Sequence, residues 1–358
     1  MTRVCILSAV NIRHMTMISL YTERLKRDNI EYDIIYMDKY GEKEEFSANK
    51  KFVFTNLINQ KRNRVIKTLK YFKFRPYATA ILEENQYDFI IVWNDIAIIM
   101  FGDYLSKKWP GRYCLNIRDI MVGKNLLVDN QYKRAIKNSA YTTISSDAFK
   151  KYLPDHDYVF VHSLNEKQMS KISPRKSFQS KNVPIRITFI GYIRYMAINK
   201  RLMDIFKNDS RFQLNFFGTR VEELEKYALD HNMKNVDFYG TFPVKDTYKF
   251  IEKTDLVNNL YGNETKNLRT ALSNKLYQGI YNRTPILVYP KTYMAKIIKK
   301  YQIGYVVSQF DEDLPDQIFN WYHALSFQEF NKNCEKIMCE IEQNHDQFDK
   351  HFTKYFLS

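Results

Sequence analysis

A short polar and basic cluster, Ser273, Asn274 and Lys275, lies between two apolar segments of the chain. We expect a short buried strand before it at residues 255–260, and a second strand at residues 285–288, after the helix that begins near Ser273. Ser273 and Asn274 suit the N-cap of that helix, whose unpaired backbone N–H groups attract phosphate. Lys275 can place its ammonium on the same anion. The spacing therefore indicates a diphosphate site without a glycine-rich loop.

The elements that would position this cluster come from an alternation of apolar strands and amphipathic helices along the whole chain. Six strands are expected in the first half, at residues 3–9, 32–37, 87–93, 112–117, 140–145 and 158–162. At residue 185 the pattern restarts, and strands are expected at residues 185–191, 212–218, 236–240, 255–260, 285–288 and 304–307. This alternation predicts an α/β protein with two doubly wound sheets.

A length of 358 residues favours two domains. The boundary falls in a polar segment rich in lysine and serine, where we place a linker at residues 171–184. We therefore expect one Rossmann-like domain over residues 1–170 and a second over residues 185–325, facing each other across a cleft. Residues 326–358 are expected to form an amphipathic helix that packs across both domains.

The net charge of +15 implies an anionic partner, and the charge is concentrated. Residues 46–82 hold nine Lys or Arg and no Asp or Glu. Part of this segment fits a basic amphipathic helix of the kind that docks on anionic membranes, although a solvated surface helix is the alternative. The membrane-contacting cations would be Lys61, Arg62, Arg64, Lys67 and Lys70. No nucleic-acid-binding motif accompanies the charge, so nucleic acid is not expected as a partner.

Several sequence features indicate where the protein works and which chemistries it lacks. No apolar run is long enough to span a membrane, and residues 3–9 indicate a buried strand rather than a signal peptide. The four scattered cysteines are expected to be reduced thiols of the core. We expect a cytoplasmic protein, peripheral at the inner face of the cell membrane. The loop at residues 8–16 has no glycine, so the dinucleotide fingerprint is absent, and we expect no metal site.

Three segments of the second half resemble the donor domain of GT-B glycosyltransferases, nearest to family 4 and related bacterial capsule and exopolysaccharide enzymes. They are ITFIGYIRYMAINKRLMDIF, FQLNFFGTRVEELEKYALDHNMKNVDFYGTF, and SNKLYQGIYNRTPILV followed by MAKIIKKYQIGYVV. The first half matches more loosely, through VCILS, LNIRD and YTTIS. The resemblance implies transfer of a sugar from a nucleotide diphosphate sugar, with a UDP-sugar favoured and no cofactor. The acceptor would be a glycan, lipid-linked, in the synthesis of a surface polysaccharide.

The resemblance also implies a donor site. Arg194 and Lys200 correspond to the family's diphosphate-binding Arg and Lys, although the family usually places the Arg directly after the glycine at 191. Two cations would stabilise the leaving diphosphate without a metal. By the same analogy, Ser273, Asn274 and Lys275 would meet the diphosphate. The other donor-site residues implied are Gly191, Tyr239, Gly240, Thr241, Asn259, Tyr261 and Gln278, with residues 239–241 at the base.

The family's two glutamates, eight residues apart, are not kept here. Gln278 stands at the ribose-binding position, where an amide can still hydrogen-bond a diol, and Thr270 stands at the earlier one. Glu264 is the nearest acid. Retaining and inverting transfer both stay open, as do the donor sugar and the oligomeric state. Two other functions also stay open: a sugar-nucleotide epimerase on the same fold, and a non-catalytic GT-B partner subunit.

The acceptor side offers three candidates. Asp119 follows the strand at residues 112–117, and an inverting transferase needs such a carboxylate as general base. A structural turn with Arg118 is the alternative for Asp119, and Asp95 is the second choice for the base. His14, in the first loop, is a candidate for acceptor binding.

Overall fold

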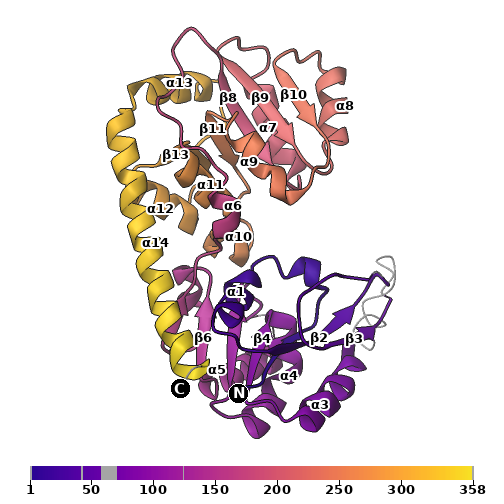
Figure 1. The fold of residues 1–358 in the computed structure, drawn as a ribbon. Coiled ribbons are helices and arrows are strands. Elements are labelled where there is room, and N and C mark those ends of the chain that lie inside the picture. The colour runs from indigo at the N-terminus through magenta and orange to yellow at the C-terminus, as the bar shows by residue number, and fades with distance from the viewer. Residues whose placement is uncertain (1, 42, 58–70, 124, 357–358) are drawn as a thin grey trace. The chain divides into compact units, whose positions relative to one another are not determined.

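The computed structural model describes residues 2–41, 43–57, 71–123 and 125–356. The chain divides into two compact units: unit 1 is Met1–His162 with Gln343–Ser358, and unit 2 is Ser163–Glu342. Each unit is built on one parallel β-sheet, so the two expected doubly wound sheets are confirmed (Figure 1).

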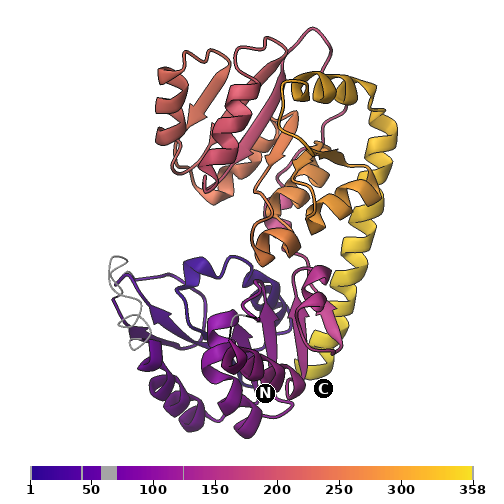
Figure 2. The same ribbon diagram turned by 180° about the vertical axis from the view of Figure 1, so that it is seen from behind.

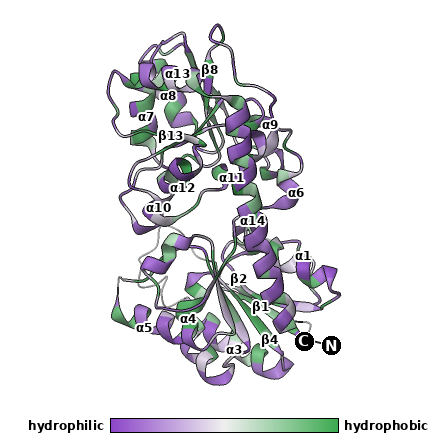
Figure 3. Cartoon of the chain, turned by 90° about the vertical axis from the view of Figure 1, so that its left-hand side faces the viewer, coloured by the Kyte–Doolittle hydropathy of each residue, from purple (hydrophilic) through white to green (hydrophobic). Residues whose placement is uncertain are grey.

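Unit 1 contains a seven-stranded sheet in the order β3-β2-β1-β4-β5-β6-β7, in which every neighbouring pair is parallel. Its strands are β1 (Val4–Ser8), β2 (Tyr32–Asp38), β3 (Lys51–Thr55), β4 (Phe89–Trp93), β5 (Tyr113–Ile117), β6 (Tyr141–Ile144) and β7 (Tyr158–Phe160). The central strands are buried on both faces, as expected for continuous apolar runs in a parallel sheet. Figure 3 shows β1 and β4 coloured largely as hydrophobic. Strand β3 was not among the predicted strands; it lies at the edge and alternates exposed and half-buried residues.

Helices cover both faces of this sheet. Unit 1 has the α-helices α1 (Ser19–Arg27), α3 (Phe74–Asn85), α4 (Asp95–Lys108) and α5 (Leu126–Lys137), and the 3-10 helices η1 (Ile12–His14) and η2 (Asp147–Lys151). One apolar cluster joins the sheet to α3, α4 and α5, and a second joins its other face to α1 and the end of the C-terminal helix. Figure 2 shows the same layers from behind. The helix expected after residue 145 is the short η2.

Unit 2 contains a six-stranded parallel sheet in the order β10-β9-β8-β11-β12-β13. Its strands are β8 (Ile185–Ile190), β9 (Phe212–Phe217), β10 (Val236–Tyr239), β11 (Leu256–Asn259), β12 (Ile286–Val288) and β13 (Gly304–Val306). Its helices are α6 (Glu166–Met169), α7 (Met196–Ile205), α8 (Glu222–Asp230), η3 (Val244–Asp246), α9 (Thr247–Ile251), α10 (Lys266–Thr270), α11 (Asn274–Asn282), α12 (Tyr293–Tyr301) and α13 (Leu314–Ala324). All six strands expected here are present within a residue or two.

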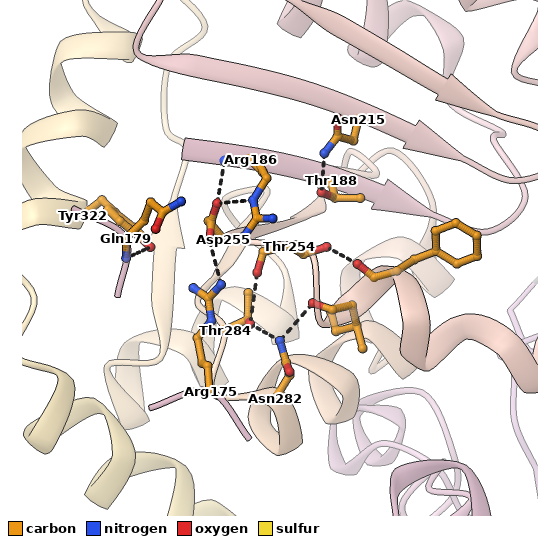
Figure 4. A network of polar contacts seen from close by, with 12 residues as sticks. Arg175, Gln179, Arg186, Thr188, Asn215, Thr254, Asp255, Asn282, Thr284 and Tyr322 are labelled. Carbon is orange, nitrogen blue, oxygen red and sulfur yellow. Dashed lines mark hydrogen bonds and ion pairs between the residues drawn. The ribbon is translucent and has the colours of Figure 1, made fainter. Parts of the chain in front are cut away.

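The segment that precedes unit 2's sheet is tied to it by a buried ionic network (Figure 4). Asp255 has 0% of its surface exposed, and its carboxylate accepts hydrogen bonds from Arg175 Nη2 at 2.6 Å and Arg186 Nε at 2.7 Å. Phe178 packs on Tyr322, with ring centroids 5.5 Å apart. Residues 163–184 therefore belong to unit 2, which corrects the expected boundary at residue 170 and the linker at 171–184.

Helix α14 (Phe327–Phe356) ends the described chain (Figure 1). Its residues up to Glu342 belong to unit 2 and those from Gln343 to unit 1. Lys300 Nζ lies 3.0 Å from Glu340 Oε2 within unit 2, and Arg24 Nε lies 2.6 Å from Asp349 Oδ1 within unit 1. The predicted apolar stripe is buried at Phe330, Cys334, Ile337, Ile341, Phe348 and Phe352.

Three sequence expectations concern other parts of the chain. No disulfide joins the described cysteines; Cys5, Cys114 and Cys334 are buried as expected, whereas Cys339 is exposed. None of the described helices has the length and apolarity required to cross a bilayer. The five cations of the basic segment, Lys61, Arg62, Arg64, Lys67 and Lys70, lie outside the described residues.

Candidate functional site

A cavity of about 460 Å³ opens in unit 2 at the carboxyl ends of its strands. The loops after β8, β9 and β11, the segment around η3 and the first turn of α11 contribute its walls. It is lined by Ile190, Gly191, Tyr192, Arg194, Tyr195, Gly218, Thr219, Phe242, Val244, Thr247, Tyr261, Ser273, Asn274, Lys275 and Gln278. Seven of these are residues that the sequence assigned to the donor site: Gly191, Arg194, Tyr261, Ser273, Asn274, Lys275 and Gln278.

Two glycines bring the loops after β8 and β9 into contact. Gly191 has φ +115° and Gly218 has φ +141°, so both adopt backbone conformations that side chains disfavour. A Cβ atom on Gly218 would lie 2.0 Å from the carbonyl oxygen of Gly191. The Gly191 N–H also donates to the Phe217 carbonyl at 2.8 Å. Only glycine at 218 permits this approach, which forms one wall of the cavity.

Helix α11 begins as the sequence predicts. Ser273 is its N-cap, with φ −79° and ψ 146°, and its Oγ accepts a hydrogen bond from the Lys275 N–H at 3.2 Å. The cap leaves other backbone N–H groups of the first turn without intrahelical partners. This end of the helix, with its partial positive charge, lies in the cavity wall and favours an anion there.

Lys275 is the most unusual cation of the cavity because only 6% of its surface is exposed. Its Nζ lies 4.0 Å from the ring centroid of Phe189 and 4.8 Å from that of Tyr261, and it donates to the Tyr261 hydroxyl. No carboxylate of the described chain forms an ion pair with it. A buried ammonium without an acid is costly, and an anion in the cavity would offset that cost.

The other predicted diphosphate cations differ in their positions. Arg194 is exposed at the cavity, and its Cζ lies 5.5 Å from the ring centroid of Tyr192. Lys200 does not line the cavity, because it lies on α7 and its Nζ pairs with Glu223 Oε1 at 2.9 Å. The structure therefore leaves Arg194, together with Lys275, as the cavity's cations.

The predicted base-binding segment also lies beside the cavity rather than in its lining. Thr241 Oγ1 lies 3.2 Å from Thr219 Oγ1, while Tyr239 packs on Phe250 at 5.2 Å between ring centroids. Neither these residues nor Gly240 belongs to the lining. Phe242, Val244 and Thr247 supply this part of the wall instead. The signal that sequence reasoning missed is the apolar Phe242 and Val244 flanking Pro243 in a loop just after a strand.

The two positions matched to the family's glutamates also separate in the structure. Gln278 lines the cavity from α11, whereas Thr270 is buried in α10, where its hydroxyl donates to the Lys266 carbonyl at 2.7 Å. Glu264 is exposed in the preceding loop. Asn259 is buried at the end of β11, and its Oδ1 finds no donor among the described residues.

Unit 1 holds the predicted acceptor-side residues. Asp95 is the first residue of α4, has 4% of its surface exposed and accepts a hydrogen bond from the Tyr132 hydroxyl. Burial raises the pKa of Asp95 to about 7; the Tyr132 hydrogen bond opposes this rise and the charge of Asp119 adds to it. Asp119 is exposed just after β5. Of the two carboxylates, only Asp119 is accessible to an acceptor hydroxyl in solvent.

Comparisons with known proteins give a fold but no sequence relative: the chain matches no family model and no curated protein. By structure it is similar to sucrose-phosphate synthase from Thermosynechococcus elongatus, with a TM-score of 0.74, 11% identity and 100% of each chain covered. It is also similar to Anabaena HepE in complex with UDP, with a TM-score of 0.63, 11% identity and 99% and 100% of the two chains covered. A UDP-N-acetylglucosamine 2-epimerase gives a TM-score of 0.62 at 8% identity, with 94% and 91% covered. The chain therefore resembles GT-B glycosyltransferases and has the GT-B fold, two Rossmann-like units each built on a parallel sheet.

Proposed function

We propose that this protein is a glycosyltransferase that takes its sugar from a nucleotide diphosphate sugar. The observation that carries the proposal is Lys275, a buried ammonium with no carboxylate partner, beside the capped start of α11 in a cavity of unit 2. A diphosphate supplies the missing negative charge and accepts hydrogen bonds from the backbone N–H groups at the start of the helix.

The cavity residues divide naturally along a bound nucleotide. Lys275, the α11 N-terminus and the exposed Arg194 hold the diphosphate, and their charge stabilises it as it leaves, so the proposed transfer requires no metal. Gln278 offers an amide to the ribose hydroxyls. Phe242 and Val244 supply apolar surface for the base. A UDP-sugar is the favoured donor, and the UDP bound to the structurally similar HepE supports this choice.

The acceptor is proposed to be a glycan, lipid-linked and used in surface polysaccharide synthesis. Asp119 is the general base of the inverting form of the reaction, while a retaining transfer would need no such base. The basic segment at residues 61–75 would hold the protein at the inner face of the cell membrane. Charge reversal at Lys61, Arg64, Lys67 and Lys70 should abolish binding to anionic vesicles.

The test is a thermal-shift panel with UDP, GDP, CMP and dTDP, with and without their sugars. A nucleotide that binds the folded protein raises the melting temperature, and the shift grows with the logarithm of the ratio of its concentration to the dissociation constant. We expect one nucleotide, UDP, to stabilise the protein and Lys275→Met to reduce the shift at the same UDP concentration. Lys200→Met is the matched control, because it removes the same charge outside the cavity lining. Unchanged melting with every nucleotide would contradict the proposal.

Two alternatives rest on specific observations. The structural similarity to a UDP-N-acetylglucosamine 2-epimerase favours a sugar-nucleotide epimerase, which would convert UDP-N-acetylglucosamine without any acceptor. Thr270 in place of a glutamate favours a non-catalytic partner subunit, which would bind nucleotides poorly. Product analysis after incubation with the donor alone identifies the first, and copurification with an active homologue identifies the second.

A further inference from the structure

Unit 1 has a cluster of cationic and aromatic side chains that the donor site does not use. We call it the β1–β2 cluster; it consists of Arg13, His14, Lys39, Tyr40 and Tyr71. Arg13 and His14 lie in η1 after β1, and Lys39 and Tyr40 directly follow β2. Because β1 and β2 are parallel neighbours, their carboxyl ends bring both loops to the same edge of the sheet.

The Arg13 guanidinium and the His14 imidazole both lie on Tyr40. The Arg13 Cζ is 3.9 Å from the Tyr40 ring centroid, and His14 Nε2 is 3.0 Å from the Tyr40 hydroxyl oxygen. Tyr40, Arg13 and His14 are all exposed. The aromatic ring therefore orders two side chains at the surface, where a ligand can reach both.

Lys39 is the informative member of the β1–β2 cluster. It is half-buried, its Nζ lies 4.8 Å from the Tyr71 ring centroid, and none of the carboxylates in the described ranges pairs with it. Burial lowers the pKa of Lys39 to about 8. It still carries its charge at neutral pH, and an anion beside it would relieve the desolvation.

Two carboxylates of the described loops, Asp38 and Glu44, accept hydrogen bonds from loop N–H groups. Asp38 accepts hydrogen bonds from the Tyr40 N–H at 2.9 Å and from Asn11 Nδ2 at 2.8 Å. Glu44 accepts from the backbone N–H groups of Ile12 and Arg13, both at 2.9 Å. These contacts hold the two loops together, and neither acid forms an ion pair with the Lys39 ammonium.

We infer that the β1–β2 cluster binds a phosphate group, with Lys39, Arg13 and His14 as its donors. Tyr40 orders Arg13 and His14, and Tyr71 lies against Lys39. Resting on the proposed function, we assign this phosphate to the acceptor, which is then a phosphorylated glycan or lipid rather than a neutral sugar. Three donors on two neighbouring loops suit a phosphate because it offers several acceptor oxygens and more than one negative charge.

His14 provides a readout at the site itself. Burial, followed by the charges of Arg13 and Lys39, lowers the pKa of His14, and the charge of Glu44 opposes this. The full chain has seven histidines, so selective 13C labelling at Cε1 gives a small set of signals, and His14→Gln assigns the one that matters. A phosphate bound beside the ring should raise the pKa of His14 by about one pH unit.

The probe is inorganic pyrophosphate, added to protein already saturated with UDP. We expect the His14 signal to move and its pKa to rise, and we expect Lys39→Met to weaken the apparent affinity by about ten-fold or more. Lys51→Met is the matched control, because Lys51 is an exposed cation at the opposite end of the β2–β3 pair. A His14 titration that pyrophosphate leaves unchanged would overturn the inference, as would equal weakening by both substitutions.

A second comparison separates the two sources of the phosphate. Octyl phosphate binding more tightly than inorganic phosphate supports a lipid-borne group, and equal binding supports a soluble sugar phosphate; both outcomes require the site. The donor site is tested separately by the thermal shift with UDP, which Lys275→Met should reduce and Lys39→Met should leave unchanged. Loss of the UDP shift in the unmodified protein would contradict the proposed function while leaving the His14 measurement interpretable.

Discussion

Replacing Lys275 by Met should change stability and nucleotide binding in opposite directions. Lys275 is buried, with 6% of its surface exposed, and the end of its side chain lies over the rings of Phe189 and Tyr261. Met fills a similar volume, keeps this packing and removes the charge. Burying an ammonium without an acid is costly, although the two aromatic rings offset part of the cost by about 1 kcal/mol each.

The expected gain in the unfolding free energy of the nucleotide-free protein is about 1 kcal/mol, since uncharged replacements of buried ionic groups are often stabilising. A gain of this size raises the melting temperature of a unit of this length by about 2–4 °C. The same substitution removes one charge-assisted contact with the diphosphate, worth about 2 kcal/mol, which weakens UDP binding roughly 30-fold.

Differential scanning calorimetry with and without UDP measures both quantities on one sample. Lys200→Met should change neither by a comparable amount, because its ammonium is partly exposed and pairs with Glu223. The reasoning is refuted if Lys275→Met destabilises the free protein while UDP shifts its melting temperature as much as that of the unmodified protein. That outcome would make Lys275 a packing residue rather than an anion ligand.

Three further predictions follow from particular contacts. Gly218→Ala should cost about 3 kcal/mol or more in urea unfolding, because its Cβ would overlap the Gly191 carbonyl, whereas Gly240→Ala should be tolerated because no atom lies within 4 Å of its Cβ. Asp255→Asn should cost about 3–5 kcal/mol, because it leaves two arginines around a buried position without a carboxylate. Burial alone would raise the pKa of Asp255, but Arg186 and Arg175 outweigh burial and lower the pKa. The stabilisation by Asp255 is therefore present above the pKa of the unfolded state and is lost as the pH falls through the pKa of the folded state. Measuring the free energy of unfolding at pH 5 and at pH 3 tests this. The raised pKa of Asp95, about 7, gives the opposite pH dependence. The free energy of unfolding should fall as the pH rises from about 4 to 7, and Asp95→Asn should remove that dependence.

The alternation of elements could be predicted because it depends on local periodicity. Strands such as Val4–Ser8 and Ile185–Ile190 are apolar throughout, and the apolar stripe of Phe327–Phe356 repeats at helical spacing. Lys51–Thr55 was missed because an edge strand exposes half of its residues and begins with lysine. The boundary near His162 was missed for a different reason: residues after it look like a linker in composition, yet Arg175 anchors them to Asp255.

The sequence by itself determined the start of α11, since an N-cap is built from adjacent residues, Ser273 to Lys275. Only the tertiary structure decided which side chains share the cavity with them. Lys200 was near the right loop in sequence, but its position on α7 directs it to Glu223, while Phe242 enters the wall from a distant loop. The burial of Lys275 without an acid likewise depends on Phe189 and Tyr261, which come from other elements. Caps and periodicity are encoded by near neighbours, whereas cavities, burial and ion pairs arise between residues that only folding brings together.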